Sequence, residues 1–492
     1  MNRRQFLQLA AVVTAGAATD SCARLTPRYA PPAKLTRPEE KLLLKNASVV
    51  DVVRGTVESR RLVLLREGRI AEVLGPESVG GMAADREIDL GDAFLCPGII
   101  NAHCHMTLPG GISLGPGLFL VYKRQLERNA EECVKHGVTT VRDMLALSDF
   151  LVELNEKISR GEIVGPRISS CCAMDVEGGY GDKMAWFARQ QFWQEVNRPE
   201  EGREAVRLAA DSGADFIKLF QQPRELFLPG KNLPVMQTEL IQTIREAAER
   251  RGLYVAVHHT EKAGLLKCLD GGVRTLEHMT TDTLLTEEDV GRIAAGGQIL
   301  VPTASVAFAL AYEKHGDPNW GKGFSPRIAE ERARELPGLI EEFCEPELVP
   351  GSLRFFRKLS NPESFEHWHL LPWPDPSVMN AAANFGSTNT RLLQEAGVTF
   401  GCGNDGGVPL IFPGAMGLEM VLLQEQGIKP AEVLKMATIH NARLLRMEKD
   451  LGTVEKGKIA DLVVFEKNPL EDLYATLKPR QVFQSGRLVF SA

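Results

Sequence analysis

The sequence of 492 residues lacks three features that would narrow its class: a long apolar run, a basic block and a regular cysteine pattern. No apolar run reaches the roughly 20 residues that a membrane-spanning helix needs. No block of basic residues suggests contact with nucleic acid, and the formal net charge is −7. The 9 cysteines are an odd number without a Cys-x-x-Cys pair, so no disulfide framework is evident. These absences argue against a membrane span and against nucleic acid as a partner.

The composition is that of a globular protein. Hydrophobic residues make up 44% of the chain and charged residues 25%. The length exceeds that of one typical domain and allows a large buried core. One large α/β domain with a small companion domain fits these values.

The N-terminus differs from the rest of the chain. Arg3-Arg4-Gln5-Phe6-Leu7 is a twin-arginine pattern, followed by an alanine-rich apolar stretch and the small residues Ala15-Gly16-Ala17. We therefore expect residues 1–18 to be a twin-arginine-type signal peptide and the protein to be periplasmic or otherwise exported. The alternative is a frayed N-terminal helix.

Residues 19–40, rich in proline and charge, are expected to form a linker. Cys22 lies in this stretch after Thr19-Asp20-Ser21, which matches a lipoprotein site poorly. A lipid anchor at Cys22 is therefore not expected.

Short β-type runs separated by glycines occupy both ends of the remaining chain, at 41–95 and again at 450–492. Between them, at 96–449, strand-like runs alternate with helical patterns. The eight strand-like runs are 93–105, 138–144, 167–175, 215–220, 254–260, 274–279, 298–305 and 398–405. This order predicts an α/β fold, a (β/α)8 barrel with a small β-sandwich domain formed from both termini. The stretch of about 306–396 is too long for a connection and predicts a partly helical insertion over one barrel face.

The segment Pro97–His105, which contains His103 and His105, ends the first barrel run. Side chains two apart on a strand share a face, so both imidazoles are expected to point into the barrel mouth. Such a pair at the carboxyl end of a barrel strand suits Zn²⁺ or a similar divalent ion. The pair alone is a weak signal, because strand histidines are often simply packed.

Four more residues strengthen the metal hypothesis. They lie in or at the end of other strand-like runs: Lys218, His258, His278 and Asp405. Lys218 stands among apolar residues, where a lysine is costly unless it is paired or neutralised. Because the carboxyl ends of barrel strands meet at one rim, we predict that all six side chains converge there.

With these residues the sequence resembles the amidohydrolase superfamily, in particular the branch of imidazolonepropionase-like proteins and metal-dependent dipeptidases of the prolidase and Xaa-Arg type. The resemblance covers most of residues 41–490. Its specific segments are Pro97–His105, Gly137–Asp143, Lys218, Val255–His258, Glu277-His278, Asp405 and Gly452–Asp461.

The resemblance implies two divalent metal ions, with zinc favoured. One ion would be bound by His103, His105 and Asp405, and the other by His258 and His278. Lys218, carboxylated by CO₂, would bridge them. Imidazolonepropionases usually lack the bridging lysine and use one metal, so Lys218 favours the two-metal, dipeptidase-like side.

The implied reaction is attack of a metal-bridging hydroxide on a substrate carbonyl. Two cations lower the pKa of the water between them, which yields a nucleophile near neutral pH. Asp405 would act as general base and then as general acid toward the leaving nitrogen.

Two departures from the family pattern concern the substrate. Where members often have His-Ala-His, this sequence has His258-His259-Thr260, and strand alternation turns His259 toward the helices, so packing is expected for it rather than metal binding. Where dipeptidase-like relatives often have Gly-Gly-His, it has Gly178-Gly179-Tyr180. Tyr180 either replaces that histidine in contacting the substrate carbonyl or is a loop aromatic.

Two arginines are further candidates for substrate binding. Arg142 and Asp143 end the second strand, where a structural ion pair is favoured and a contact to a substrate carboxylate is the alternative. Arg224 follows the fourth strand and is a candidate for the same contact.

We therefore predict a metal-dependent hydrolase that cleaves an amide C–N bond of a small substrate, with a dipeptide or an N-acyl amino acid favoured. The alternatives are a cyclic-amide or imidazolone hydrolase, or a deaminase, on the same site. A binding protein that has lost its chemistry is disfavoured, because all six residues are present. The sequence is compatible with assembly as a homo-oligomer.

Overall fold

The computed structural model describes residues 41–78, 84–113, 117–145, 148–181, 193–224, 232–311, 326–359 and 376–492. The predicted signal peptide, the linker and Cys22 lie outside these residues. Among the described residues, no helix combines the length and apolar character needed to cross a membrane.

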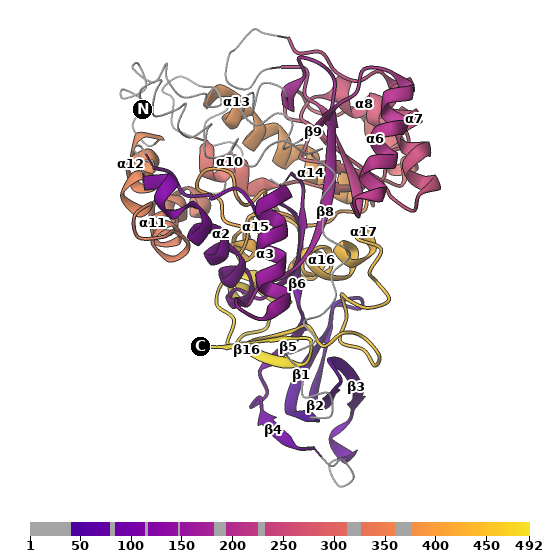
Figure 1. Cartoon of the computed structure of the whole chain (residues 1–492). Helices are drawn as coiled ribbons and strands as arrows, with labels where there is room; N and C mark the ends of the chain where they lie inside the picture. The colour runs from indigo at the N-terminus through magenta and orange to yellow at the C-terminus, as the bar shows by residue number, and fades with distance from the viewer. Residues whose placement is uncertain are drawn as a thin grey trace.

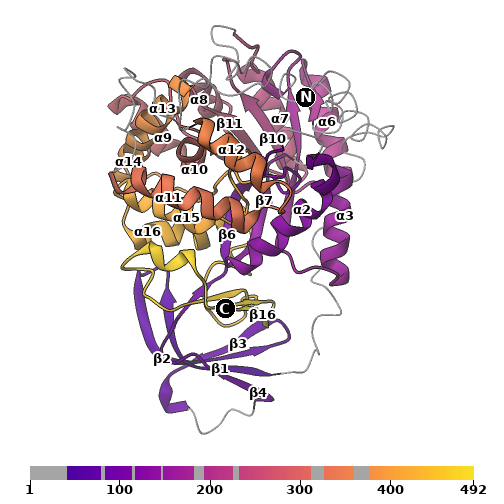
Figure 2. The ribbon, with the colours of Figure 1, turned by 90° about the vertical axis from the view of Figure 1, so that its left-hand side faces the viewer.

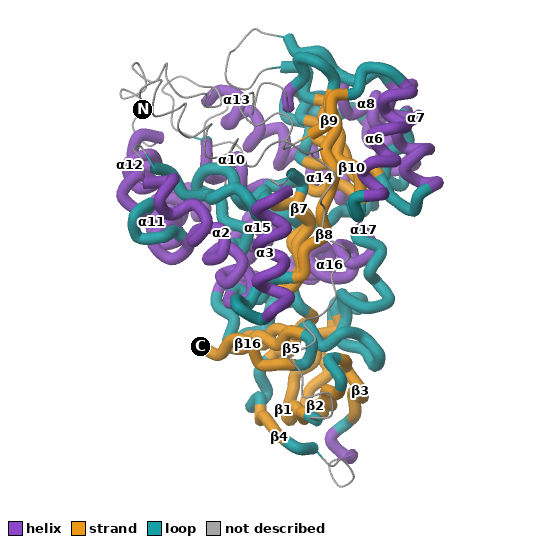
Figure 3. Tube along the Cα trace, viewed as in Figure 1, coloured by secondary structure: helices purple, strands orange, loops and turns teal. Residues whose placement is uncertain are grey.

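A small β domain and a large α/β domain make up the described chain, and Figures 1 and 3 show the β domain below the larger one. The small domain takes strands from both ends of the chain. They are β1 (Leu42–Asp51), β2 (Thr56–Arg66), β3 (Arg69–Leu74), β4 (Arg86–Asp89), β5 (Phe94–Pro97), β14 (Leu462–Phe465), β15 (Gln481–Gln484) and β16 (Arg487–Ser491). Their order is β16-β15-β14-β5-β1-β2-β3, with β4 beside β1. The predicted small domain formed from both termini is thus confirmed.

Strand β14 joins two hydrophobic cores. Val463 and Phe465 belong to the large core that includes the barrel, whereas Leu462 and Val464 belong to the core of the small domain. This split follows from strand geometry, since successive side chains point to opposite faces. A strand buried on both faces holds the small domain against the barrel.

Seven parallel strands form the barrel sheet in the order β13-β12-β11-β10-β8-β7-β6. Their bounds are β6 (Ile99–Cys104), β7 (Val138–Asp143), β8 (Arg167–Asp175), β10 (Phe216–Gln221), β11 (Val255–His259), β12 (Thr275–Glu277) and β13 (Ile299–Val301). A short strand, β9 (Trp193–Glu195), pairs with β8 outside this order. The first predicted run is divided at Gly98, where a Cβ atom would lie 2.2 Å from Thr139 Oγ1.

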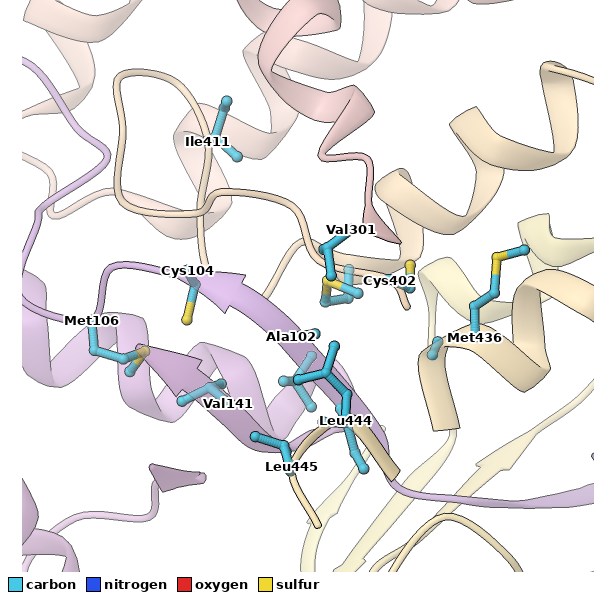
Figure 4. Packing of buried hydrophobic residues seen from close by; sticks show 14 of the residues in the cluster. Ala102, Cys104, Met106, Val141, Val301, Cys402, Ile411, Met436, Leu444 and Leu445 are labelled. Atoms are coloured by element: carbon cyan, nitrogen blue, oxygen red, sulfur yellow. The ribbon is translucent and has the colours of Figure 1, made fainter. Parts of the chain in front are cut away.

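The eighth position of the barrel is irregular but closes it. Residues 398–406 contribute isolated parallel bridges on both sides, Leu300 to Phe400 and Cys104 to Gly406. Figure 4 shows Cys402 of this segment near Val301 of β13 and Ala102 of β6. At Gly403 the backbone passes so close to β6 that a Cβ atom would lie 2.4 Å from His103 N. The predicted (β/α)8 barrel is therefore confirmed, with its last strand reduced to bridges.

Helices surround the barrel strands (Figure 2). They are α2 (Gly117–Lys135), α3 (Ser148–Arg160), α6 (Pro199–Asp211), α7 (Thr238–Arg250), α8 (Lys262–Asp270), α9 (Glu287–Gly296), α15 (Met416–Glu425), α16 (Pro430–Lys435) and α17 (Asn441–Leu444). In α7 the buried residues recur three or four positions apart, as a helix with one face on a core requires.

The long stretch between the last two barrel strands is helical where it is described. Its helices are α10 (Ala304–Leu310), α11 (Pro326–Phe343), α12 (Val349–Leu359), α13 (Pro376–Ala381) and α14 (Ser387–Glu395). Helix α11 packs on α2, where Gln125 Nε2 donates to Phe343 O at 2.9 Å. Helix α12 holds the loop after β6, because Ile112 N donates to Ser352 Oγ at 2.8 Å. Helix α14 packs on α9, as a barrel helix does.

The predicted seventh strand, 298–305, is longer than the observed one. Strand β13 ends at Val301, and Thr303 adopts a left-handed backbone with φ 51° before α10 begins. A left-handed residue cannot continue a strand, so the chain turns into the helix at this point.

Candidate active site

Histidine and aspartate side chains from four places in the chain meet at the carboxyl ends of the barrel strands. Ligand atoms of His103, His278 and Asp405 lie within 4.8 Å of one another. His105 joins them, with its Nε2 2.9 Å from Asp405 Oδ1. His258 lies beside His278, with 4.5 Å between the ring centroids. The structure thus brings together five of the six side chains named as metal ligands.

Lys218 faces the same cluster from β10. Its register partner on β11 is Ala256, two residues before His258, so Lys218 and His258 share a strand face. Its positive charge is among the causes that lower the pKa values of His258 and His278, after burial itself. The side chain is 2% exposed, and its Nζ has no hydrogen-bond partner among the described residues.

Burial also alters the charge state of the site. It lowers the pKa of Lys218 to about 8, because a buried ammonium loses its hydration. It holds the pKa values of His258 and His278 well below the usual range, so both imidazoles are neutral, as metal ligands must be. Although burial acts in the opposite direction on Asp405, His103 and His105 keep the pKa of its carboxyl well below normal.

Each of the four histidines uses one ring nitrogen on a protein group. His103 Nδ1 lies 2.9 Å from Glu277 Oε2, His105 Nδ1 lies 3.2 Å from Leu145 O, His258 Nε2 lies 3.2 Å from Gln222 Oε1, and His278 Nδ1 lies 2.7 Å from Thr303 Oγ1. Such partners fix the orientation of a ligating ring. The second nitrogen of each ring is then left for a cation: Nε2 of His103, His105 and His278, and Nδ1 of His258.

Two of these residues reach the site through unusual backbone geometry. His278 and Asp405 both have left-handed backbones, with φ of 70° and 57°. His258 is paired in register with Glu277, so Glu277 faces the barrel interior and strand alternation alone would turn His278 outward. The left-handed turn at His278 allows both neighbours to face the site. This conformation is uncommon for non-glycine residues, although aspartate and histidine adopt it more often than most.

Arg142 lies in the buried interior and not at an open surface. It is fully buried, and its Nη2 donates to both oxygens of Glu277 at 2.7 Å. Despite burial, Arg142 and His103 hold the pKa of Glu277 well below its usual value. The ion pair of Arg142 is therefore with Glu277, where the sequence suggested Asp143. Asp143 instead accepts backbone N–H groups of Met106 and Leu145.

The other candidates for substrate contact lie in two different settings. Tyr180 is 8% exposed and stacks on His258, with 4.9 Å between ring centroids and 20° between planes. Burial raises the pKa of its hydroxyl, so the hydroxyl keeps its proton. Arg224 has a largely exposed side chain and pairs with Glu261 at 3.1 Å.

The side chains of His258, His259 and Thr260 point to alternating faces, as expected from the sequence. His258 Nε2 and Thr260 Oγ1 both contact Gln222 Oε1, so they share a face. His259 is buried, and burial lowers its pKa to about 4, so it is neutral.

Three residues that contact the ligands were not identified from the sequence: Glu277, Gln222 and Thr303. Gln222 lies four residues after Lys218, and strand spacing could have placed it on the same face. Glu277 directly precedes His278, and predicting that it faces the site would have required the register of two strands. Thr303 gives no sequence signal, because its role depends on a left-handed turn.

The donor set fits divalent cations. Imidazole nitrogens and carboxylate oxygens are suitable ligands for Zn²⁺ and similar ions. Asp405 Oδ1 lies 3.2 Å from His103 Nε2 and 2.9 Å from His105 Nε2, yet it has no aligned hydrogen bond among the described residues. Atoms that share a cation are expected to approach in this way. The unpartnered amine of Lys218 points to the same conclusion, because buried polar atoms are rarely left unpaired.

Parallel barrel strands with a candidate metal site at their carboxyl rim define a class of barrel hydrolases. The chain belongs to the amidohydrolase family, whose model matches residues 94–489. It is accordingly a hydrolase of carbon–nitrogen bonds.

Known proteins resemble the chain over different shares of its length. Ochratoxinase of Aspergillus niger is 24% identical over 428 residues, which is 80% of this chain and 75% of that protein. Imidazolonepropionase of Shouchella clausii (strain KSM-K16) is 33% identical over 295 residues, 47% of this chain and 64% of that protein. A crystal structure of a Xaa-Pro dipeptidase with bound methionine superposes with a TM-score of 0.69 at 23% identity, covering 92% of this chain and all of that one. The predicted family resemblance is confirmed.

Proposed function

We propose that the protein hydrolyses the amide C–N bond of a dipeptide or an N-acyl amino acid. The observation that carries the proposal is the unpartnered, buried amine of Lys218 beside four histidines and Asp405. The likeness in fold to a Xaa-Pro dipeptidase supports a dipeptide-like substrate.

In this proposal two divalent cations occupy the rim, with Zn²⁺ favoured. His103, His105 and Asp405 would hold one, His258 and His278 would hold the other, and Lys218, carboxylated by CO₂, would supply a further oxygen ligand. When bound, such cations lower the pKa of coordinated water and polarise a carbonyl oxygen. Only a neutral amine reacts with CO₂, and the lowered pKa of Lys218, about 8, makes the neutral form accessible near neutral pH.

Asp405 is the proposed general base and general acid. Its Oδ1 faces the two histidines of β6, so Oδ2 is the oxygen that takes a proton from the attacking water. The same oxygen then delivers the proton to the leaving nitrogen. Tyr180 keeps its proton and lies against His258, so its hydroxyl is proposed to donate to the carbonyl oxygen of the substrate.

The test is a screen of the purified, zinc-loaded protein against dipeptides, N-acyl amino acids and cyclic amides, with release of free amine as the readout. Hydrolysis confined to cyclic amides would support the alternative reaction, and turnover of no amide would refute the proposal. Asp405→Asn should keep much of its metal, measured by elemental analysis, and lose nearly all turnover. Full activity of that variant would refute the role of Asp405.

Export by a twin-arginine route is a separate proposal that rests on Arg3 and Arg4 of the sequence. In bacterial cells producing the full chain, the protein should be recovered from the periplasm. Replacing both arginines by lysine should retain it in the cytoplasm. An unchanged distribution would contradict the proposal.

A further inference from the structure

Glu419 is a buried acid that the proposed reaction does not use. It lies on α15 and has no exposed surface. Its Oε1 accepts the N–H of Ala304 at 2.8 Å, and its Oε2 accepts the N–H and the hydroxyl of Ser305 at 2.7 and 2.6 Å. These groups belong to the first turn of α10, so Glu419 caps that helix from a distant part of the chain.

The residue that would ordinarily cap α10 is Thr303. Threonine at this position commonly accepts a hydrogen bond from the first-turn N–H groups of its own helix. Here the Thr303 side chain makes no such bond, and its backbone is left-handed. Its hydroxyl instead lies 2.7 Å from Nδ1 of His278.

These two arrangements depend on each other. A β-branched residue in the left-handed region is strained, so the surrounding structure must hold it there. The side chain of Glu419 fixes the two residues directly after Thr303 and accepts N–H groups that the Thr303 hydroxyl leaves unbonded. The Thr303 hydroxyl is then free to orient the His278 ring.

We propose that Glu419 is a positioning residue for the candidate metal site, acting through Thr303 on His278. By capping α10 in place of Thr303, it lets the Thr303 hydroxyl fix the ring that leaves Nε2 for a cation. The inference rests on the proposed metal site, and the three hydrogen bonds of Glu419 go to α10 and to none of the candidate metal ligands.

The test measures Zn²⁺ binding to the metal-free protein by competition with a coloured chelator, and the visible spectrum after loading with Co²⁺. Thr303→Val removes the hydroxyl at nearly constant volume, and we expect about a 10- to 100-fold loss of affinity for one ion. Glu419→Gln should weaken binding of the same ion by up to about tenfold, since its effect is indirect. Both variants should change the Co²⁺ spectrum, and Thr303→Ser should retain wild-type affinity and spectrum.

A protein that carries both Thr303→Val and Glu419→Gln tests whether Glu419 affects the metal site only through Thr303. If Glu419 acts through Thr303, the double variant should lose no more affinity than Thr303→Val alone. Additive losses would overturn the inference. Wild-type affinity in folded Glu419→Gln would overturn it too.

Asp289→Asn is the matched control, because the Asp289 carboxylate accepts the N–H of Thr286, the N-cap of another helix, α9. It should lower the melting temperature and leave the affinity for Zn²⁺ unchanged. If Glu419→Gln does not fold, Ser305→Ala removes one of the three hydrogen bonds and should give a smaller loss of affinity, and no loss would contradict the inference. Failure of the wild-type protein to bind Zn²⁺ would instead refute the proposed function.

Discussion

Two buried arginine–carboxylate pairs at opposite ends of the barrel use the same interaction for different purposes. At the carboxyl rim, Arg142 of β7 pairs with Glu277 of β12 at 2.7 Å. At the base, Arg167 of β8 pairs with Asp461 at 2.8 Å, just before β14 of the small domain. The side chains of both pairs are 5% exposed or less.

The partners of the two carboxylates differ. Glu277 also binds Nδ1 of His103, so the rim pair sets the orientation of a candidate metal ligand. Asp461 also accepts the N–H of Ser485, and Arg167 donates to Thr140 Oγ1. The Arg167–Asp461 pair thus connects the barrel to the small domain, and these partners include no candidate metal ligand.

The two ends of the barrel differ in how completely their buried ionisable groups are hydrogen-bonded. At the rim, the ionisable side chains of Lys218 and Asp405 each have a buried atom without a hydrogen-bond partner in the described chain. Such features cost free energy unless a bound group completes them. At the base, Asp461 uses both of its oxygens in hydrogen bonds. Rim variants should therefore lose function, and base variants should lose stability.

The largest effect is expected for Lys218→Met. Replacing the buried amine by an apolar chain of similar length should lower turnover at least about 10²–10³-fold, as for loss of other active-site electrostatic groups. The same change should stabilise the metal-free protein by about 1–3 kcal/mol, because the desolvated amine has no partner to lose. Urea unfolding and amide hydrolysis measure the two effects.

A companion variant separates loss of charge from loss of the bridge. Lys218→Ala should also be inactive, but short carboxylic acids such as acetate or propionate should restore part of its activity. An equally active Lys218→Ala protein would exclude the two-metal proposal. A Lys218→Met protein that is less stable without metal would break the contrast between rim and base.

Asp461→Asn should produce the largest loss of stability. It leaves Arg167 charged and buried without its carboxylate, which typically costs about 3–5 kcal/mol. Turnover per folded molecule and metal content should stay at the wild-type level. Replacing both partners by apolar residues should recover much of the stability, as determined by urea unfolding. Loss of metal in folded Asp461→Asn would show that the base is not independent of the rim.

Glu277→Gln should affect stability and metal binding together. It weakens the partner of Arg142 and the acceptor of His103, and loss of such a partner typically lowers metal affinity about 10–100-fold. Zn²⁺ competition on the metal-free protein measures the change, with Asp461→Asn as the control. Unchanged affinity in a folded Glu277→Gln protein would mean that His103 does not depend on the rim pair.

The sequence was sufficient for the features that depend on local pattern. Eight alternating runs predicted the barrel, and strand ends predicted where His103, His258 and Asp405 lie. Lys218 was recognisable because a lysine within an apolar strand has no ordinary explanation.

Features that depend on distant partners could not be predicted. Arg142 and Glu277 are 135 residues apart, and their pairing follows from the register of short strands. Glu419 and Ser305 are 114 residues apart and belong to two helices with no related pattern. The last barrel strand was predicted as regular, but Gly403, Gly406 and the left-handed Asp405 reduce it to bridges.

The smallest predicted effect concerns the pH dependence of stability that arises from Glu419. Burial raises the pKa of Glu419 to about 7, whereas an unfolded glutamate titrates near 4.3. The folded state therefore keeps a proton that the unfolded chain has already lost at intermediate pH. This contribution to stability is complete below the unfolded pKa and is lost as pH rises through about 7.

Glu419→Gln cannot titrate, so the stability of the wild-type protein relative to this variant should fall between pH 5 and pH 8. Urea unfolding of both metal-free proteins at the two pH values measures the change. Asp289→Asn is again the control, because the pKa of Asp289 is lowered by Lys262 and other partners despite burial. Its contribution is lost only as pH falls below the range tested, so that difference should stay constant. If the difference in unfolding free energy between the wild-type protein and Glu419→Gln is also constant, then Glu419 is already ionised at pH 5. In that case its three hydrogen bonds lower its pKa more than burial raises it.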